Sequence, residues 1–176
     1  MKTYSLIKQI LLGSILVLNL KLSFGADWPM WGRDGTRNMV SDEKNITLDF
    51  NPGEMNDDEV VDMKTTNNVK WVAKLGSQAY GNVTIGNGCV FVGTNNESPR
   101  DPGKIGDRGV VMCLDEKTGE LKWQLVIPKL GAGKVSDWEY IGICSSAAIE
   151  GDKVYVVTNR CEVVCLDING LADGND

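Results

Sequence analysis

Histidine is absent from the 176-residue sequence, and its absence removes several kinds of chemistry. Without an imidazole there is no Ser–His or Cys–His catalytic pair. A mixed Cys/His zinc site is excluded for the same reason, and no two cysteines have the C-x-x-C spacing of an all-cysteine site. The sequence therefore indicates no metal site, and its catalytic and cofactor-binding residues are left unassigned.

Basic residues are outnumbered, with 18 Lys and Arg against 24 Asp and Glu and a net charge of −6. Nucleic acids are bound through a basic footprint, and anionic membrane surfaces attract clustered Lys and Arg. The charge therefore argues against both as partners. The acidic stretch Met55–Met63 is expected to form a solvated face.

Long hydrophobic runs are also missing. The apolar stretch Ile10–Leu18 is short for a membrane span, follows Lys2 and Lys8, and precedes the small residues of a cleavage site at Ser23–Gly25. This order is that of a secretory signal peptide over residues 1–25, with a membrane anchor as the alternative. The sequence predicts a periplasmic or secreted mature protein without a membrane span.

Cysteine is sparse and odd in number, with five residues. At least one of them therefore pairs outside the chain or stays a thiol. Most lie in β-type stretches, where a small buried apolar side chain is the simplest interpretation. Export permits disulfides, and Cys89 and Cys113 can face each other across a hairpin and form one. The pairing stays open for the whole set, which is Cys89, Cys113, Cys144, Cys161 and Cys165.

No segment has the apolar period of an amphipathic helix, and 20 glycines favour turns and short strands instead. From Asn67 onward short runs of β-formers alternate with turn residues, which indicates an all-β fold. Residues 26–68 form an opening segment that we expect to pack onto the main body through Trp28, Met30 and Trp31. The expected strands of the first part are 70–72, 83–85, 89–93, 109–114 and 121–127.

An internal repeat narrows the fold to one architecture. Insertions at 97–108 and 128–139 interrupt an otherwise regular unit of four strands with tight turns. Such a unit buries its faces only between neighbours, which is the pattern of a β-propeller blade. The matched segments are 82–95 with 146–159, 111–115 with 163–167, and 70–71 with 122–123.

Residues 69–176 therefore hold about two blades, and the second is truncated after Leu171, before its last strand and its tryptophan. Because a closed propeller has about four to eight blades, we expect the chain to be the N-terminal part of a longer protein. The total number of blades and the oligomeric state stay open.

The stretch VVMCLDEKTGELKW shows what each blade repeats. Asp115 to Gly119 is expected to be the hairpin between the third and fourth strands, with the carboxylate accepting backbone N–H groups and the glycine in the left-handed conformation. Trp123 then lies on the outermost strand, where a large flat side chain can cover the joint between two blades.

These residues resemble the pyrroloquinoline-quinone (PQQ)-type β-propeller repeat, here GCVFVGT…GVVMCLDEKTGELKW and GDKVYVVTNRCEVVCLDING, over about 69–171. The opening WPMWG is similar to the start of many exported bacterial members. The family contains quinoprotein dehydrogenases, which bind PQQ with calcium or a lanthanide and oxidise alcohols. It also contains scaffolds without a cofactor, such as a lipoprotein of outer-membrane protein assembly. The adjacent Cys-Cys pair of many of the dehydrogenases is absent here.

The resemblance implies an exported PQQ-like propeller protein. The lack of an identifiable catalytic constellation favours a non-catalytic binding or scaffold module, with a protein or small molecule as its partner. The alternative is a PQQ- and calcium-dependent quinoprotein dehydrogenase whose active-site residues lie beyond residue 176. The substrate or partner is not specified, and whether the protein is an enzyme is left open. No cofactor can be assigned from the residues themselves.

The two insertions hold the candidate site residues. Asp137–Tyr140 can form part of a ligand-facing loop, or a solvated loop with Trp138 packed on the neighbouring blade. Asn95–Glu97 and Asp101 can supply oxygen ligands to a hard cation, or can simply form turns. Gly131–Lys134 lacks the spacing of a phosphate-binding loop.

Overall fold

The computed structural model describes residues 26–131 and 138–170, and in these ranges every regular element is a β-strand. The predictions that fall on the signal peptide, on Asp137 and on the truncated end at 171–176 lie outside the described residues. Within the described ranges, no helix has the length and apolar character needed to cross a membrane.

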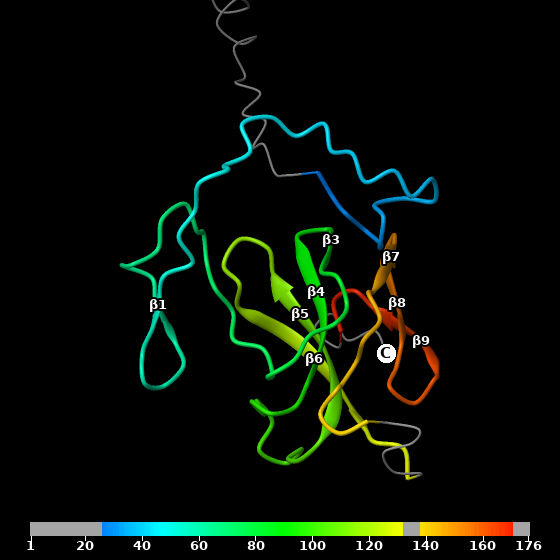
Figure 1. The fold of residues 1–176 in the computed structure, drawn as a ribbon. Coiled ribbons are helices and arrows are strands. Elements are labelled where there is room, and N and C mark those ends of the chain that lie inside the picture. Colours follow the sequence, from blue (N-terminus) through cyan, green and yellow to red (C-terminus); the bar gives the residue numbers. More distant parts are fainter. Residues whose placement is uncertain (1–25, 132–137, 171–176) are drawn as a thin grey trace, which may run out of the picture.

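The strands form two blades and one small hairpin (Figure 1). Blade one has the strands β3 (Thr84–Gly86), β4 (Cys89–Asn95), β5 (Arg108–Asp115) and β6 (Leu121–Pro128), in chain order and antiparallel. Blade two has β7 (Ala148–Glu150), β8 (Lys153–Val157) and β9 (Val163–Asp167), without a fourth strand among the described residues. The hairpin pairs β1 (Glu54–Met55) with β2 (Val61–Asp62). The strands predicted at 83–85, 89–93, 109–114 and 121–127 are confirmed to within two residues at each end.

Blade one is buried on both faces because its central strands carry continuous apolar runs, Cys89–Gly93 in β4 and Gly109–Leu114 in β5. Phe91 and Val111 point toward blade two, where they pack in one cluster with Ile149 and other core residues of that blade. On the opposite face, Val110 and Met112 belong to a second cluster. A continuous apolar run in a short strand is expected when both faces are covered. The molecule is thus a stack of propeller blades, as predicted.

The turn after β5 follows its predicted design. The Asp115 carboxylate accepts hydrogen bonds from the backbone N–H groups of Lys117 (2.8 Å) and Thr118 (3.0 Å). Gly119 has a φ of 74°, the left-handed conformation that a Cβ disfavours. The hydrogen bond from the Thr118 backbone, followed by that from Lys117, lowers the pKa of Asp115 below its ordinary value of 3.8.

This shift predicts a pH-dependent contribution to stability. Since the folded state lowers the pKa of Asp115, the carboxylate stabilises the fold above the ordinary pKa of 3.8 and loses its effect as the pH falls through the folded pKa. Asp115→Ala should therefore lower the melting temperature at pH 7, and its difference from the wild type should shrink below about pH 4. Thermal unfolding at several pH values measures this. Exposed Asp58→Ala is the control, and an unchanged Asp115→Ala difference across the pH range would contradict the assignment.

Two tryptophans occupy equivalent joints, one on each side of blade one. Trp123 of β6 donates its Nε1–H to the Ile168 carbonyl (2.9 Å) and covers Gly170 in the turn of blade two, as predicted. Trp71 donates in the same way to the Glu116 carbonyl (3.0 Å) and covers Gly119 of blade one. Trp71 therefore takes the place of an outermost-strand tryptophan from a preceding blade.

The prediction of a strand at 70–72 is wrong in one respect. The chain there is extended, and Trp71, Ala73 and Leu75 pack on blade one while Val72 lies 46% exposed. The segment 70–72 has no strand neighbour among the described residues, so it forms no β-ladder. The local pattern was right, but a strand also requires a partner for its backbone hydrogen bonds.

The cysteines divide into two kinds. Cys89 and Cys113 are buried in the core between the blades, and the structure has no disulfide between them. Burial, with the neighbouring Cys89 thiol, raises the pKa of Cys113, so this thiol stays protonated and unreactive. Cys144, Cys161 and Cys165 are exposed, which corrects the expectation that most cysteines are buried. Cys161 is in the turn before β9, and Cys165 lies on the open face of that strand.

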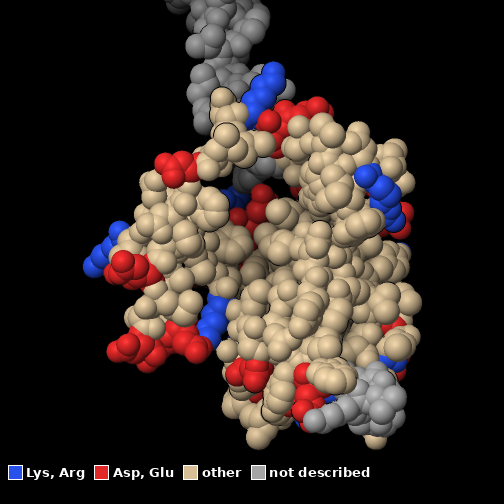
Figure 2. Space-filling model, in the orientation of Figure 1, with Lys and Arg blue, Asp and Glu red and all other residues tan. Residues whose placement is uncertain are grey.

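The opening segment contacts both blades at the innermost strands. Trp28 pairs with Ile85 in an isolated bridge, and the Pro29 carbonyl accepts a hydrogen bond from the backbone N–H of Ile149 (2.7 Å). Trp31, in contrast, is 54% exposed. Further on, the acidic stretch Met55–Met63 forms the exposed β1–β2 hairpin, so its prediction as a solvated face is confirmed (Figure 2).

Candidate binding face at the loop ends of the blades

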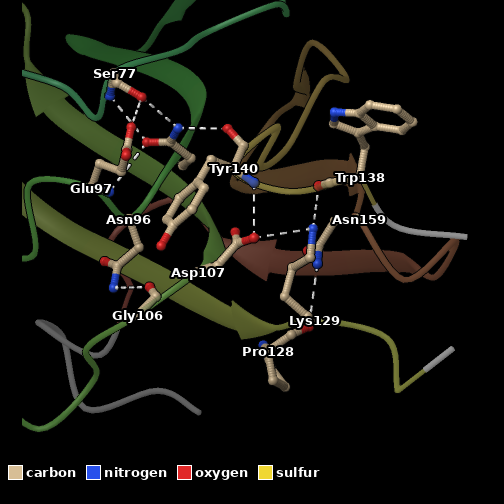
Figure 3. A network of polar contacts seen from close by, with 11 residues as sticks. Ser77, Asn96, Glu97, Gly106, Asp107, Pro128, Lys129, Trp138, Tyr140 and Asn159 are labelled. Atoms are coloured by element: carbon tan, nitrogen blue, oxygen red, sulfur yellow. Dashed lines mark hydrogen bonds and ion pairs between the residues drawn. The ribbon is translucent and has the colours of Figure 1, made fainter. Parts of the chain in front are cut away.

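The two insertions lie at the same end of the blades. One joins the end of β4 to the start of β5, and the other joins the end of β6 to β7. Antiparallel pairing of β4, β5 and β6 brings these strand ends together. We call this end the loop face, defined as residues 95–107, 128–131 and 138–142 (Figure 3).

Hydrogen bonds join the two insertions directly. The Asn95 side-chain amide donates to the Tyr140 carbonyl (2.6 Å), and the Tyr140 backbone N–H donates to the Asp107 carboxylate (2.8 Å). Asn95 and Tyr140, which the sequence marked as separate candidates, thus belong to one network. The structure shows a single connected surface where the sequence indicated two independent loops.

The candidate oxygen ligands of the first insertion are turn formers. The Asn95 Oδ1 atom accepts hydrogen bonds from the backbone N–H groups of Ser77 (3.0 Å) and Glu97 (3.2 Å). Asn96 donates its amide to the Lys104 carbonyl (2.6 Å) and so closes the loop. The Asp101 carboxylate accepts from the backbone N–H of Gly103 (2.9 Å). These groups are committed to loop structure, so of the two interpretations the structure supports turn formation.

Asp107 and Lys129 form an ion pair that the sequence did not indicate. The Lys129 Nζ lies 3.5 Å from the Asp107 carboxylate, and their side chains are only 20% and 17% exposed. Lys129 also donates a hydrogen bond to the Trp138 carbonyl. The pair thereby holds the chain on both sides of the 132–137 stretch. Asp107 follows the candidate residues of its loop, and its only sequence signal was its position just before a strand.

The aromatic residues of the second insertion face solvent. Trp138 is 64% exposed and Tyr140 is 40% exposed, and Ile105 of the other insertion is 67% exposed. The expectation that Trp138 packs down on the neighbouring blade is therefore wrong. Its backbone carbonyl is held by Lys129, whereas its ring points away from the network (Figure 3). The loop face thus combines an anchored backbone with exposed apolar side chains.

The described residues do not fit the calcium ion of a dehydrogenase. No three Cys, Asp or Glu side chains come together within 26–131 and 138–170. The Asp107 carboxylate already serves Lys129 and the Tyr140 amide, and its second oxygen is buried without a hydrogen bond in this part of the chain. One partly buried carboxylate does not replace the six to eight oxygen ligands that calcium takes.

Similarity to known proteins is found among solved structures. No family model and no curated protein matches the sequence. Among solved structures, the chain is similar to BamB from Moraxella catarrhalis, with 26% sequence identity and a TM-score of 0.34. The match covers 52% of this chain and 22% of that chain, so the chain spans less than a quarter of the length of that protein.

Proposed function

We propose that this chain is part of an exported β-propeller protein of the PQQ-like repeat family, and that it works as a non-catalytic scaffold by binding a protein partner at its loop face. The observation that carries the proposal is the set of exposed apolar side chains, Trp138, Tyr140 and Ile105, on loops fixed from beneath by Asp107 and Lys129.

The chemistry of this face supports binding over catalysis. Tryptophan and tyrosine are enriched where interfaces gain most of their energy, because they bury a large area at a low entropic cost. The polar groups beneath them already make internal bonds. Asn95 donates a hydrogen bond to the Tyr140 carbonyl, and Asp107 accepts one from the Tyr140 backbone and forms an ion pair with Lys129. A fixed backbone with exposed rings loses little conformational freedom on binding.

The proposal assigns residues 1–25 to a signal peptide and places the mature protein in the periplasm or outside the cell. Residues 26–68 are assigned to a segment that packs on the propeller, and residues 69–176 to its first two blades. Support comes from the leader sequence, from the two stacked blades, and from the contacts of Trp28 and Pro29 with both of them.

The proposal is tested by replacing Trp138. A photo-crosslinking residue at position 138 of the exported protein should capture a discrete partner, which mass spectrometry identifies. Trp138→Ala should then weaken binding of that purified partner at least tenfold in calorimetry, as expected for an interface tryptophan worth about 2 kcal/mol. Leu48→Ala is the matched control, since Leu48 is 93% exposed and lies outside the loop face.

Equal binding by Trp138→Ala and Leu48→Ala would place the interface elsewhere. The enzyme alternative has its own readout: the complete exported protein is mixed with PQQ and calcium and assayed for a bound quinone absorbance and for dye-linked alcohol oxidation. Appearance of both signals would overturn the scaffold proposal.

A further inference from the structure

The chain contains three Asn-x-Ser/Thr sequences, which begin at Asn45, Asn82 and Asn96. In an exported protein this sequence is the acceptor pattern for an N-linked glycan, and an acceptor asparagine lies in a surface loop. The structure places the three asparagines in different surroundings and so distinguishes among them.

Asn96 is closed to modification because its amide is already bound within the loop face. Its Nδ2 atom donates one hydrogen bond to the Lys104 carbonyl (2.6 Å) and another to the Gly106 carbonyl (3.1 Å), and the residue is only 5% exposed. Glycosylation replaces one of the two hydrogens on this nitrogen with a sugar. A glycan would therefore break one of these bonds and leave a carbonyl without its donor, which is costly inside a folded protein.

Asn82 is exposed, but the residues after it are fixed in blade one. Its backbone N–H donates to the Ser146 hydroxyl (2.8 Å), and Thr84 pairs with Phe91 and is fully buried. The acceptor pattern requires a hydroxyl two residues after the asparagine, so the transferase must reach that hydroxyl as well as the amide. The Thr84 hydroxyl is reached only if β3 leaves the sheet.

Asn45 lies in an open part of the chain. Residues 34–50 are all exposed and form no helix or strand, and Figure 1 shows this stretch arching away from the blades. Asn45 itself is at a bend, with a φ of 60°. Neither its side chain nor that of Thr47 has a hydrogen-bond partner within 26–131 and 138–170. The amide and the hydroxyl of this sequence are therefore both accessible.

The residue two places before the asparagine also sets this sequence apart. It is Glu43 before Asn45, whereas Tyr80 and Thr94 take that place in the other two sequences. A carboxylate there completes the acceptor pattern of bacterial oligosaccharyltransferases. The Glu43 side chain accepts a hydrogen bond from the backbone N–H of Ala26 (2.6 Å). A carboxylate accepts several hydrogen bonds, so this contact leaves it able to meet a transferase.

We propose that Asn45 is an N-glycosylation site, and that Asn82 and Asn96 stay unmodified in the folded protein. The donor is an oligosaccharide linked to a lipid diphosphate. Asn45 Nδ2 forms a bond to the anomeric carbon of the first sugar, the bond from that carbon to the diphosphate oxygen breaks, and the lipid diphosphate leaves while one amide proton is released. This inference rests on the proposed export of the protein, because the transfer takes place outside the cytoplasm.

A glycan at Asn45 would cover an apolar stretch directly after it. Ile46, Leu48 and Phe50 are 62%, 93% and 63% exposed, and they alternate with polar residues. Contiguous exposed apolar side chains favour association with other molecules. A bulky, hydrated oligosaccharide beside this stretch keeps other chains away from it.

The same glycan would leave the loop face free. The Asp27 carboxylate accepts a hydrogen bond from the backbone N–H of Asn87 (3.4 Å), in the tight turn between β3 and β4. Figure 1 shows residues 34–50 at this end of the blades, whereas the loops at 95–107 and 128–131 lie at the opposite end. Modification of Asn45 is thus compatible with a partner bound at the loop face.

The site is tested by glycopeptide mass spectrometry on the complete protein isolated from its natural host. The tryptic peptide that contains Asn45 should carry an oligosaccharide, and the peptides with Asn82 and Asn96 should carry none. Asn45→Gln and Thr47→Ala should each abolish the slower-migrating form of the protein on a denaturing gel. Thr47→Ser should retain it, because the hydroxyl is kept, and Glu43→Gln should reduce the occupied fraction.

Two different failures are told apart by cell fractionation. An unmodified Asn45 in protein that has left the cytoplasm and lost residues 1–25 overturns the site and leaves the proposed export intact. A protein that stays in the cytoplasm with its leader refutes the export, and the site with it. Occupancy of Asn82 or Asn96 equal to that of Asn45 would also overturn the proposal, because their burial and pairing would then have no effect.

The shielding of the apolar stretch has its own measurement. Asn45→Gln, and enzymatic removal of the glycan from the wild type, should both shift the protein toward larger assemblies in light scattering. Asn82→Gln is the matched control, since Asn82 is also exposed and should carry no glycan. Equal behaviour of Asn45→Gln and Asn82→Gln would contradict the shielding.

Discussion

Trp123→Ala is expected to destabilise the protein by about 3 kcal/mol and to lower its melting temperature by roughly 10 °C. The half-buried indole loses its hydrogen bond to the Ile168 carbonyl (2.9 Å) and its cover over Gly170. It also loses the tilted ring contact with Phe91, whose centroid lies 5.8 Å away. Urea unfolding followed by circular dichroism measures the loss.

Trp123→Phe separates the two contributions. It keeps a ring over the joint and removes the Nε1–H donor, so the loss should fall to about 1 kcal/mol. Trp138→Ala is the matched control, because Trp138 is 64% exposed and its removal should leave stability unchanged. If Trp123→Ala were as stable as Trp138→Ala, the indole would not hold the two blades together.

Gly142→Ala is expected to lower the free energy of unfolding by about 3–4 kcal/mol and to disturb the loop face. Gly142 has a φ of +72°, and an added Cβ would lie 2.3 Å from the Thr94 carbonyl oxygen and 2.5 Å from the Asn95 backbone nitrogen. Both atoms belong to the backbone of a buried strand, so neither can move away cheaply. Chemical unfolding gives the stability, and binding of the loop-face partner gives the local effect.

Gly88→Ala is the control that isolates the clash. Gly88 has nearly the same φ, +73°, but no atom within 4 Å of an added Cβ. Gly88→Ala should therefore lower the free energy of unfolding only by the strain of the left-handed conformation, about 1 kcal/mol. Equal losses at Gly88 and Gly142 would show that backbone conformation alone, without the close approach of β4, accounts for the effect.

The fold could be predicted because its determinants are local and repeated. The turn at Asp115–Gly119, the apolar run before it and the tryptophan after it each have a local physical reason, and the second blade repeats most of them. The predicted strand at 70–72 was wrong, because a strand also needs a neighbour, which the local pattern does not specify.

The candidate site was predicted less well, for reasons that depend on tertiary contacts. Asn95 and Tyr140 were marked as separate candidates, but their hydrogen bond could be known only once the strand ends were in place. Trp138 is exposed, and its backbone carbonyl accepts a hydrogen bond from the Lys129 side chain, a contact that no sequence periodicity indicates. Cys165 is exposed because it lies on the open face of blade two, which the apolar sequence around it could not indicate.

The bridge made by Trp28 and Pro29 has a consequence for the order of folding. These residues are synthesised before either blade, yet they bond to Ile85 in the first and to Ile149 in the second. Contacts between residues so distant in sequence require closure of a long loop, which slows folding. Trp28 can therefore pair only after blade one has been made, and the Pro29 carbonyl only after blade two. Until then the Trp28 indole ring is available to a chaperone or to aggregation.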